Sequence, residues 1–211
     1  LGDVYKRQPW GSATLRSPLL GAFNASNLAA ALTAALTAGL PLEATVKAVA
    51  SLTPVPGRME PLPRRDNAPL VVVDYAHTPD ALRQVLTALR PQVSGRLIAV
   101  FGCGGDRDRG KRADMAACAS ALADVSFVTS DNPRSEDPQS IIDDITAGMS
   151  GDYRPILDRA AAIAEAVAFA NSEDCVLIAG KGHEDYQIIG EQRLPFSDVE
   201  QARSALAERS A

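Results

Sequence analysis

Two different patterns of hydrophobic residues divide the chain near residue 54. Residues 23–52 read as two alanine- and leucine-rich helices, one from Asn27 to Ala38 with a Gly39 stop and one from Pro41 to Leu52. After residue 58, short apolar runs alternate with longer segments of helical character. Residues 53–57, which hold two prolines and a glycine, separate the two patterns. Such residues break regular structure, so this segment is predicted to be a hinge between domains.

The apolar runs of the second part are predicted to be strands of a parallel sheet, because continuous apolar runs are typical of strands that are covered on both faces. The four runs are residues 70–73, 97–101, 125–129 and 175–179. The predicted helices are residues 79–89, 111–122, 138–148 and 159–170. A hairpin over residues 186–196 follows, and Asp198 is expected to cap a last helix. This alternation predicts a doubly wound, Rossmann-like α/β domain.

Composition narrows the class of protein. The 211 residues are enough for one large domain, or for a domain and part of another. A net charge of −5 argues against a partner that is a nucleic acid. The three cysteines lack the spacing of a zinc site or a disulfide framework, so we expect no metal site and a cytoplasmic protein. No apolar run reaches eighteen residues, so no membrane insertion is expected.

The first eight residues stand apart from the rest of the pattern. Residues 1–8 contain no initiating Met and no apolar core of a signal peptide. We interpret them as a non-native, adaptor-derived segment, and we expect the chain to be a fragment of a longer protein.

Each of the four predicted strands ends in a polar or glycine-rich loop. These loops are residues 74–80, 102–108, 131–134 and 180–184. The carboxyl ends of parallel strands lie at one edge of a sheet, which is where open α/β folds bind ligands. The four loops are therefore predicted to converge on one cleft.

The loop after the third strand offers the chemistry of an amino-acid site. Asp131, Asn132 and Arg134, with Glu136 behind them, combine a guanidinium, an amide and carboxylates. A guanidinium binds a carboxylate through two hydrogen bonds, and acids with an amide bind an ammonium. Alone, the same residues could form an ordinary turn, but their position among three other polar strand ends favours a pocket for a zwitterion.

The glycine-rich loop matches neither common nucleotide motif. Arg107 stands where a dinucleotide fold needs its third glycine, and Arg112 stands where a P-loop needs Ser or Thr. We interpret Gly104 and Gly105 as a tight turn that directs Arg107 into the cleft, with a turn of solvated charges as the alternative.

Three further residues of the loops have no decided role. His77 and His183 could be catalytic, or could brace the loops as structural histidines. Lys181, between two glycines, could face an anion or could equally be solvated.

These motifs together resemble the Mur ligases, and within that family the members that add meso-diaminopimelate. The resemblance runs from about Leu15 to the C-terminus, with departures at Ala22 and Ala113. The motifs that carry it are residues 21–27, 55–60, 74–79, 102–108 with Lys111 and Arg112, 131–134 and 180–184.

The resemblance implies two sets of binding residues. One set would hold meso-diaminopimelate: Arg107, Asp131, Asn132, Pro133, Arg134, Gly180 and Glu184. The other set would lie near ATP: Asn24, Asn27, Arg58 and Asp74. His77, Lys181 and His183 would support these sites. A second carboxylate distinguishes diaminopimelate from lysine, and Arg134 offers its counter-charge.

The resemblance also implies an activity. ATP, with Mg²⁺, would phosphorylate the D-glutamate γ-carboxylate of UDP-MurNAc-L-Ala-D-Glu, and the amine of diaminopimelate would attack the acyl phosphate. Residues 9–54 would be the end of a central ATP-binding domain, and residues 55–211 the amino-acid-binding domain of a monomer. No G-x-x-x-x-G-K-S/T motif occurs, so we expect no ligation by this chain alone. A folylpolyglutamate or cyanophycin synthetase-type domain, and a non-enzymatic amino-acid sensor, are the alternatives.

Overall fold

The computed structural model describes residues 10–64 and 66–209, so the predicted adaptor-derived segment 1–8 lies outside the described residues. The chain divides after Val55 into two compact units. The first unit contains α1 (Ala22–Thr37) and α2 (Leu42–Ala50). Helix α1 begins at Ala22 rather than at Asn27, and Gly39, at φ +91°, follows its end as predicted.

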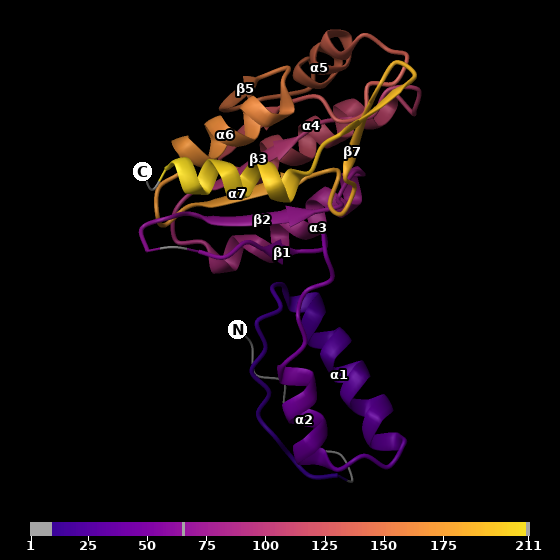
Figure 1. Cartoon of the computed structure of the whole chain (residues 1–211), viewed down its shortest axis with the longest axis vertical. Coiled ribbons are helices and arrows are strands. Elements are labelled where there is room, and N and C mark those ends of the chain that lie inside the picture. Colours follow the sequence, from indigo (N-terminus) through magenta and orange to yellow (C-terminus); the bar gives the residue numbers. More distant parts are fainter. Residues whose placement is uncertain (1–9, 65, 210–211) are drawn as a thin grey trace. The chain divides into compact units, whose positions relative to one another are not determined.

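The second unit is built on a six-stranded sheet (Figure 1). Its strands are β1 (Glu60–Pro61), β2 (Leu70–Asp74), β3 (Leu97–Phe101), β4 (Val125–Val128), β5 (Tyr153–Pro155) and β6 (Cys175–Ala179). The spatial order is β1-β2-β6-β3-β4-β5, and all neighbours are parallel except β1 and β2. The last strand of the sheet, β6, thus lies between β2 and β3. The carboxyl ends of these parallel strands therefore share one edge.

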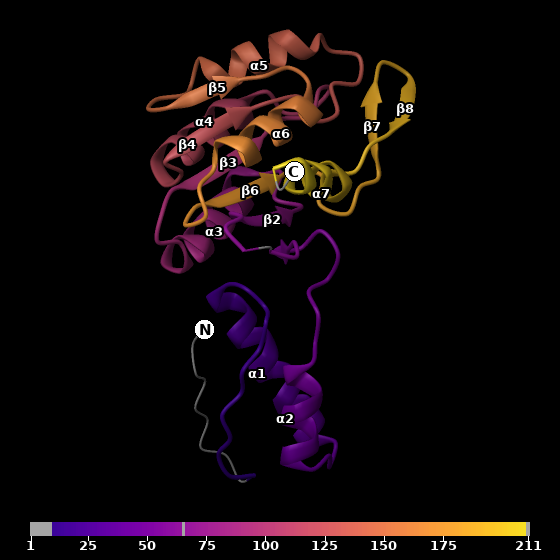
Figure 2. The ribbon, with the colours of Figure 1, turned by 60° about the vertical axis from the view of Figure 1, so that its left-hand side comes forward.

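Helices cover both faces of the sheet, which confirms the predicted doubly wound α/β class (Figures 1 and 2). On one face, α4 (Gly110–Leu122) packs between α3 (Pro79–Leu89) and α5 (Pro138–Thr146). On the other, α6 (Arg159–Phe169) packs beside α7 (Asp198–Glu208). A short 3₁₀ helix (Arg90–Gln92) follows α3. The hairpin of β7 (Tyr186–Ile189) and β8 (Gln192–Pro195) forms a separate two-stranded sheet.

The two covered faces explain why the strands read as continuous apolar runs. Alternate strand residues such as Val71, Ile98 and Val176 belong to a core that includes Ile163 of α6 and Leu206 of α7. The intervening strand residues are buried as well, and β3 and β6 are buried along their whole length. Burial on both faces removes the hydrophobic–polar alternation that marks a half-exposed strand.

Two strands and one helix cap differ from the sequence-based predictions. Strands β1 and β5 were not predicted, because β1 has two residues and β5, at the sheet edge, has partly exposed ones. The cap of α7 is Ser197, whose side chain accepts a hydrogen bond from the Glu200 N–H, and not Asp198. Asp198 is the first helical residue and is fully buried, and its carboxylate is paired with Arg159. None of the described helices is long and apolar enough to cross a membrane.

Ser197→Ala should therefore destabilise the second unit. Loss of the cap leaves the Glu200 N–H without its side-chain acceptor, and the expected decrease in the free energy of unfolding is about 1 kcal/mol. Urea denaturation followed by circular dichroism measures it. Ser135→Ala is unsuitable as a control because Ser135 binds Asp106, whereas Ser204→Ala, at an exposed helix position, should change stability little.

Candidate functional site

The four polar loops meet around one cavity of about 280 Å³ at the carboxyl edge of the sheet. The loops follow β2, β3, β4 and β6, as predicted from the strand ends. The cavity is lined by Tyr75, His77, Thr78, Gly104, Arg107, Lys111, Asp131, Asn132, Arg134, Gly180 and Glu184. Their convergence follows from parallel topology, since each chain segment leaves the sheet at the same edge.

The backbone of Arg134 is held in an unusual conformation beside this cavity. Its φ of +53° lies in the left-handed region, which costs a non-glycine residue free energy. Two hydrogen bonds to the β7–β8 hairpin offset this cost. The Arg134 N–H donates to the Ile188 carbonyl at 3.1 Å, and the Gly190 N–H donates to the Arg134 carbonyl at 2.7 Å. The guanidinium Nη1 donates to the Gly105 and Asn132 carbonyls at 2.9 and 3.3 Å. These bonds fix both the backbone and one end of the side chain.

The amide of Asn132 has a defined orientation. Its Oδ1 accepts hydrogen bonds from the Lys181 ammonium at 2.8 Å and from the Ile188 N–H at 2.9 Å. Its Nδ2 therefore faces Glu184, to whose Oε2 it donates at 3.1 Å. Because both Asn132 and Glu184 line the cavity, the amide presents N–H and the carboxylate presents oxygen to a ligand.

The glycine-rich loop is shaped by close packing rather than by a tight glycine turn, which corrects the prediction. Neither Gly104 nor Gly105 has positive φ, and the residue in the left-handed region is Asp106 at φ +54°. A Cβ on Gly105 would lie 1.9 Å from the Pro133 carbonyl oxygen. The glycines thus allow the loop to touch residues 131–134. Arg107 lines the cavity as predicted, and its Nη1 donates to the Asp106 carbonyl.

The carboxylates of Asp106 and Glu136 join the glycine-rich loop to the loop that follows β4. Asp106 accepts hydrogen bonds from the Ser135 hydroxyl and N–H, and these bonds lower the pKa of Asp106. The Asp106 N–H in turn donates to Glu136, and this bond together with the buried Arg112 lowers the pKa of Glu136. Both carboxylates are therefore charged at neutral pH, and Glu136 braces the site rather than lining it.

Lys181 is not solvated, so that alternative is wrong. Its side chain is fully buried behind the cavity, and it lies 3.2 Å from Asp131 Oδ1 and 3.9 Å from Glu184 Oε2. Burial lowers the pKa of Lys181, while the Asp131 carboxylate opposes that shift. The ammonium faces internal carboxylates instead of an anion in solution.

The two histidines brace one tyrosine at the cavity. The Tyr75 ring lies 4.6 Å from the His77 ring and 5.3 Å from the His183 ring, between centroids. His77 Nδ1 lies 2.8 Å from the Tyr75 carbonyl oxygen, and the Arg58 guanidinium lies over the Tyr75 ring. Of the two histidines, only His77 lines the cavity. These contacts fit the loop-bracing interpretation.

The residues predicted to lie near a nucleotide fall in both units. Asp74 is buried, and its two carboxylate oxygens accept the Met59 and Ala76 N–H groups. Burial raises the pKa of Asp74 in spite of these bonds. Asn24 and Asn27, on α1 of the first unit, are bonded to each other through the Asn27 amide. Their nucleotide roles stay predictions.

The cavity combines charges of both signs. Arg107, Lys111 and Arg134 are its cations, and Asp131 and Glu184 are its carboxylates. Pro133 contributes its carbonyl to loop packing rather than to the lining. Cys103 lies close by, but burial raises its pKa to about 12, so it is an inert thiol. Among the described residues no group of three or more His, Cys, Asp or Glu could hold a metal ion. The arrangement suits a zwitterion.

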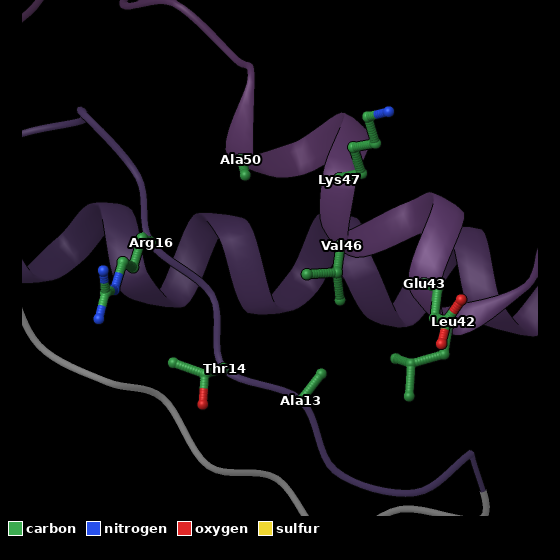
Figure 3. Close-up of a pocket in the computed structure, with 8 residues that line it drawn as sticks. All are labelled: Ala13, Thr14, Arg16, Leu42, Glu43, Val46, Lys47 and Ala50. Atoms are coloured by element: carbon green, nitrogen blue, oxygen red, sulfur yellow. The ribbon is translucent and has the colours of Figure 1, made fainter.

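A hollow in the first unit is larger than the cavity at the strand ends (Figure 3). Its lining comes from the extended segment before α1 and from α2: Ala13, Thr14, Arg16, Leu42, Glu43, Val46, Lys47 and Ala50. Half of these residues are aliphatic, and no ends of the described strands converge on the hollow. We therefore place the candidate site at the polar cavity.

Sequence reasoning missed part of the site. Lys111 and Tyr75 belong to motifs of the resemblance, yet neither was assigned to the cavity that both line. The contact of the hairpin with residues 131–134 was missed because nothing in its alternating pattern specifies a partner. Position at the start of the helix after β3 was the signal that could have identified Lys111, and position directly after β2 was the signal for Tyr75.

Comparison with known proteins identifies the family. The family model described as "Mur ligase, glutamate ligase domain" matches residues 57–182, which is more than half of the chain. Relatives named UDP-N-acetylmuramoyl-L-alanyl-D-glutamate–2,6-diaminopimelate ligase, from Gloeobacter violaceus and a Synechococcus strain, are 53% and 56% identical over 95% and 97% of this chain. The chain spans 42% of each of them. A solved structure of that name is 50% identical, with a TM-score of 0.76, over 97% of this chain and 42% of its own. The chain therefore belongs to the Mur ligase family.

Proposed function

We propose that this chain supplies the amino-acid-binding part of an ATP-dependent ligase that adds meso-diaminopimelate to UDP-MurNAc-L-Ala-D-Glu during peptidoglycan precursor synthesis. The observation that carries the proposal is one cavity lined by Arg107 and Arg134 together with Asp131 and Glu184. The names of the relatives support it, and they favour neither a folate-type ligase nor an amino-acid sensor.

The charges of the cavity match one end of diaminopimelate. Each end of this molecule carries an ammonium and a carboxylate. Arg134 and Arg107 would bind the carboxylate, and Asp131 and Glu184 would bind the ammonium. Lysine has no second carboxylate, so its binding would leave the Arg134 guanidinium without a ligand partner. A site built for the extra group rejects a substrate that lacks it.

The contribution of this chain would be orientation rather than acid–base catalysis. Holding the far end of diaminopimelate directs its other amine toward an acyl phosphate, which converts a bimolecular attack into a pre-positioned one. ATP with Mg²⁺ supplies the chemistry that activates the D-glutamate γ-carboxylate. The exposed Arg58 guanidinium fits a phosphate, whereas both oxygens of Asp74 already accept N–H bonds and would act by shaping the loop. Residues 9–54, with Asn24 and Asn27, would be the end of the ATP-binding domain.

Isothermal titration of meso-diaminopimelate into the 211-residue chain tests the proposal. Arg134→Ala should weaken binding by at least about tenfold, because a hydrogen-bonded ion pair is lost. Binding of L-lysine should change much less. Arg83→Ala, at an exposed position on α3, is the matched control and should bind as the wild type does. Equal affinities of wild type and Arg134→Ala for meso-diaminopimelate would remove Arg134 from the site.

A further inference from the structure

A buried lysine joins three elements behind the cavity. The Lys181 side chain is fully buried, although it lies between two glycines in the loop that follows β6. Its ammonium donates to the Asn132 Oδ1 at 2.8 Å and to the Tyr186 carbonyl at 2.9 Å. One side chain thus links the end of β6, residues 131–134 and the start of the β7–β8 hairpin.

The surroundings require a cation at this position. Asp131 Oδ1 is buried and accepts no hydrogen bond among the described residues, yet it lies 3.2 Å from the Lys181 ammonium. Glu184 Oε2 lies 3.9 Å from the same ammonium. A buried carboxylate that loses a nearby counter-charge is destabilised, and removal of Lys181 would take away the cation that lies 3.2 Å from Asp131 Oδ1. We expect the loop of residues 131–134 to move so that water can solvate the Asp131 carboxylate.

The hairpin contacts show which groups such a movement would release. Gln187 Nε2 donates to the Asp131 carbonyl at 2.7 Å, and the Ile188 N–H shares the Asn132 Oδ1 with Lys181. The hairpin also holds the backbone of Arg134 on both sides. Since Arg134 is in a left-handed conformation, it depends on these partners to stay there.

We propose that Lys181 is a positioning residue of the amino-acid site. Its ammonium orients the Asn132 amide and fastens the hairpin to residues 131–134, so that Asn132 and Arg134 face the cavity before a ligand arrives. Lys181 itself lies behind the lining residues and acts through them. The identity of the amino acid rests on the proposed function, whereas the positioning does not.

Amide hydrogen exchange of the ligand-free 211-residue chain tests the positioning. In Lys181→Met, the N–H groups of Arg134, Ile188 and Gly190 should exchange at least about tenfold faster, because the local opening that exposes them becomes easier. The N–H groups of β3 should keep their rates. Lys47→Met makes the same change at an exposed lysine of α2 and should alter neither set. Lys181→Gln, which keeps N–H donors on a shorter side chain, is measured by the same criteria if Lys181→Met does not fold.

The outcomes separate the two proposals. Unchanged exchange at Arg134 overturns the positioning role, and equal acceleration in β3 overturns it too, because Lys181 would then only stabilise the whole unit. Titration of meso-diaminopimelate is the second measurement, in which Lys181→Met should lose at least about tenfold in affinity, as expected for a site whose binding groups are no longer preorganised. Faster local exchange in a chain whose wild type does not bind meso-diaminopimelate would support positioning and contradict the proposed function.

Discussion

Replacement of Arg159 by methionine is expected to lower the free energy of unfolding of the second unit by about 3–5 kcal/mol, the range for breaking a buried ion pair from one side. In a protein of this size, that corresponds to a fall in melting temperature of roughly 10 °C. Arg159 and Asp198 are both fully buried, and two hydrogen bonds of 2.7 and 2.8 Å join them. Methionine would leave the Asp198 carboxylate buried without a counter-charge.

Arg159 also ties together the strand ends that carry the site. Its guanidinium donates to the Ala179 carbonyl at 3.0 Å and to the Ser130 carbonyl at 3.4 Å. Burial disfavours the charged guanidinium, yet Asp198 together with Asp131 and Glu184 raises the pKa of Arg159. The side chain therefore stays charged, and its loss would affect both the core and the loops after β4 and β6.

A double variant separates the charge effect from packing. In Arg159→Met with Asp198→Leu no charge is left unpaired, so much of the lost stability should return. Arg193→Met is the control, since its partner Asp185 lies 3.7 Å away and both side chains are exposed, so the expected change is less than about 1 kcal/mol. Urea denaturation measures all four proteins. An Arg159→Met variant as stable as wild type would contradict the view that Asp198 needs Arg159 as its counter-charge.

The strands and the position of the site could be predicted from sequence because both depend on local information. Strands β3 and β6 have the predicted bounds, since an apolar run between polar loops is itself the signal of a doubly covered strand. The convergence of the four loops then follows from parallel topology alone. No knowledge of side-chain contacts was needed for either step.

The parts that could not be predicted depend on pairs of residues far apart in the chain. Arg159 and Asp198 are separated by 39 positions, and Lys181 and Asn132 by 49. Nothing in the sequence distinguishes Arg159 or Asp198 from an exposed charged residue at the start of a helix. Asp198 therefore read as a cap, and Lys181 read as a solvated lysine as readily as a functional one. Only tertiary packing decides which charges are buried.

Gly105→Ala is expected to have the second large effect, because it separates two loops of the site. The added Cβ would lie 1.9 Å from the Pro133 carbonyl oxygen and 2.8 Å from its carbonyl carbon, where backbone leaves little room to yield. The Gly105 N–H also donates to the Asn132 carbonyl at 2.9 Å. We expect a loss of at least about 3 kcal/mol in unfolding free energy, at the upper end for overpacking.

Two nearby glycines provide variants for comparison with Gly105→Ala. Gly110→Ala meets only the Asp108 side chain, at 3.2 Å, and should leave stability within about 1 kcal/mol of wild type. Gly104→Ala meets the Arg134 Nη1 at 2.8 Å, so it should displace a side chain and weaken binding with little loss of stability.

Titration of meso-diaminopimelate should then rank the three glycine variants. Misplacement of a binding loop by about 1 Å can cost about a hundredfold, so Gly105→Ala should bind more weakly than Gly104→Ala, and Gly110→Ala should bind as wild type does. Wild-type stability in Gly105→Ala would contradict the expected overpacking. Wild-type affinity in a destabilised Gly105→Ala would show that the loops can separate without disturbing Asn132 and Arg134. In that case the close packing of the glycine loop would serve folding alone, and the binding groups would be positioned from the hairpin side.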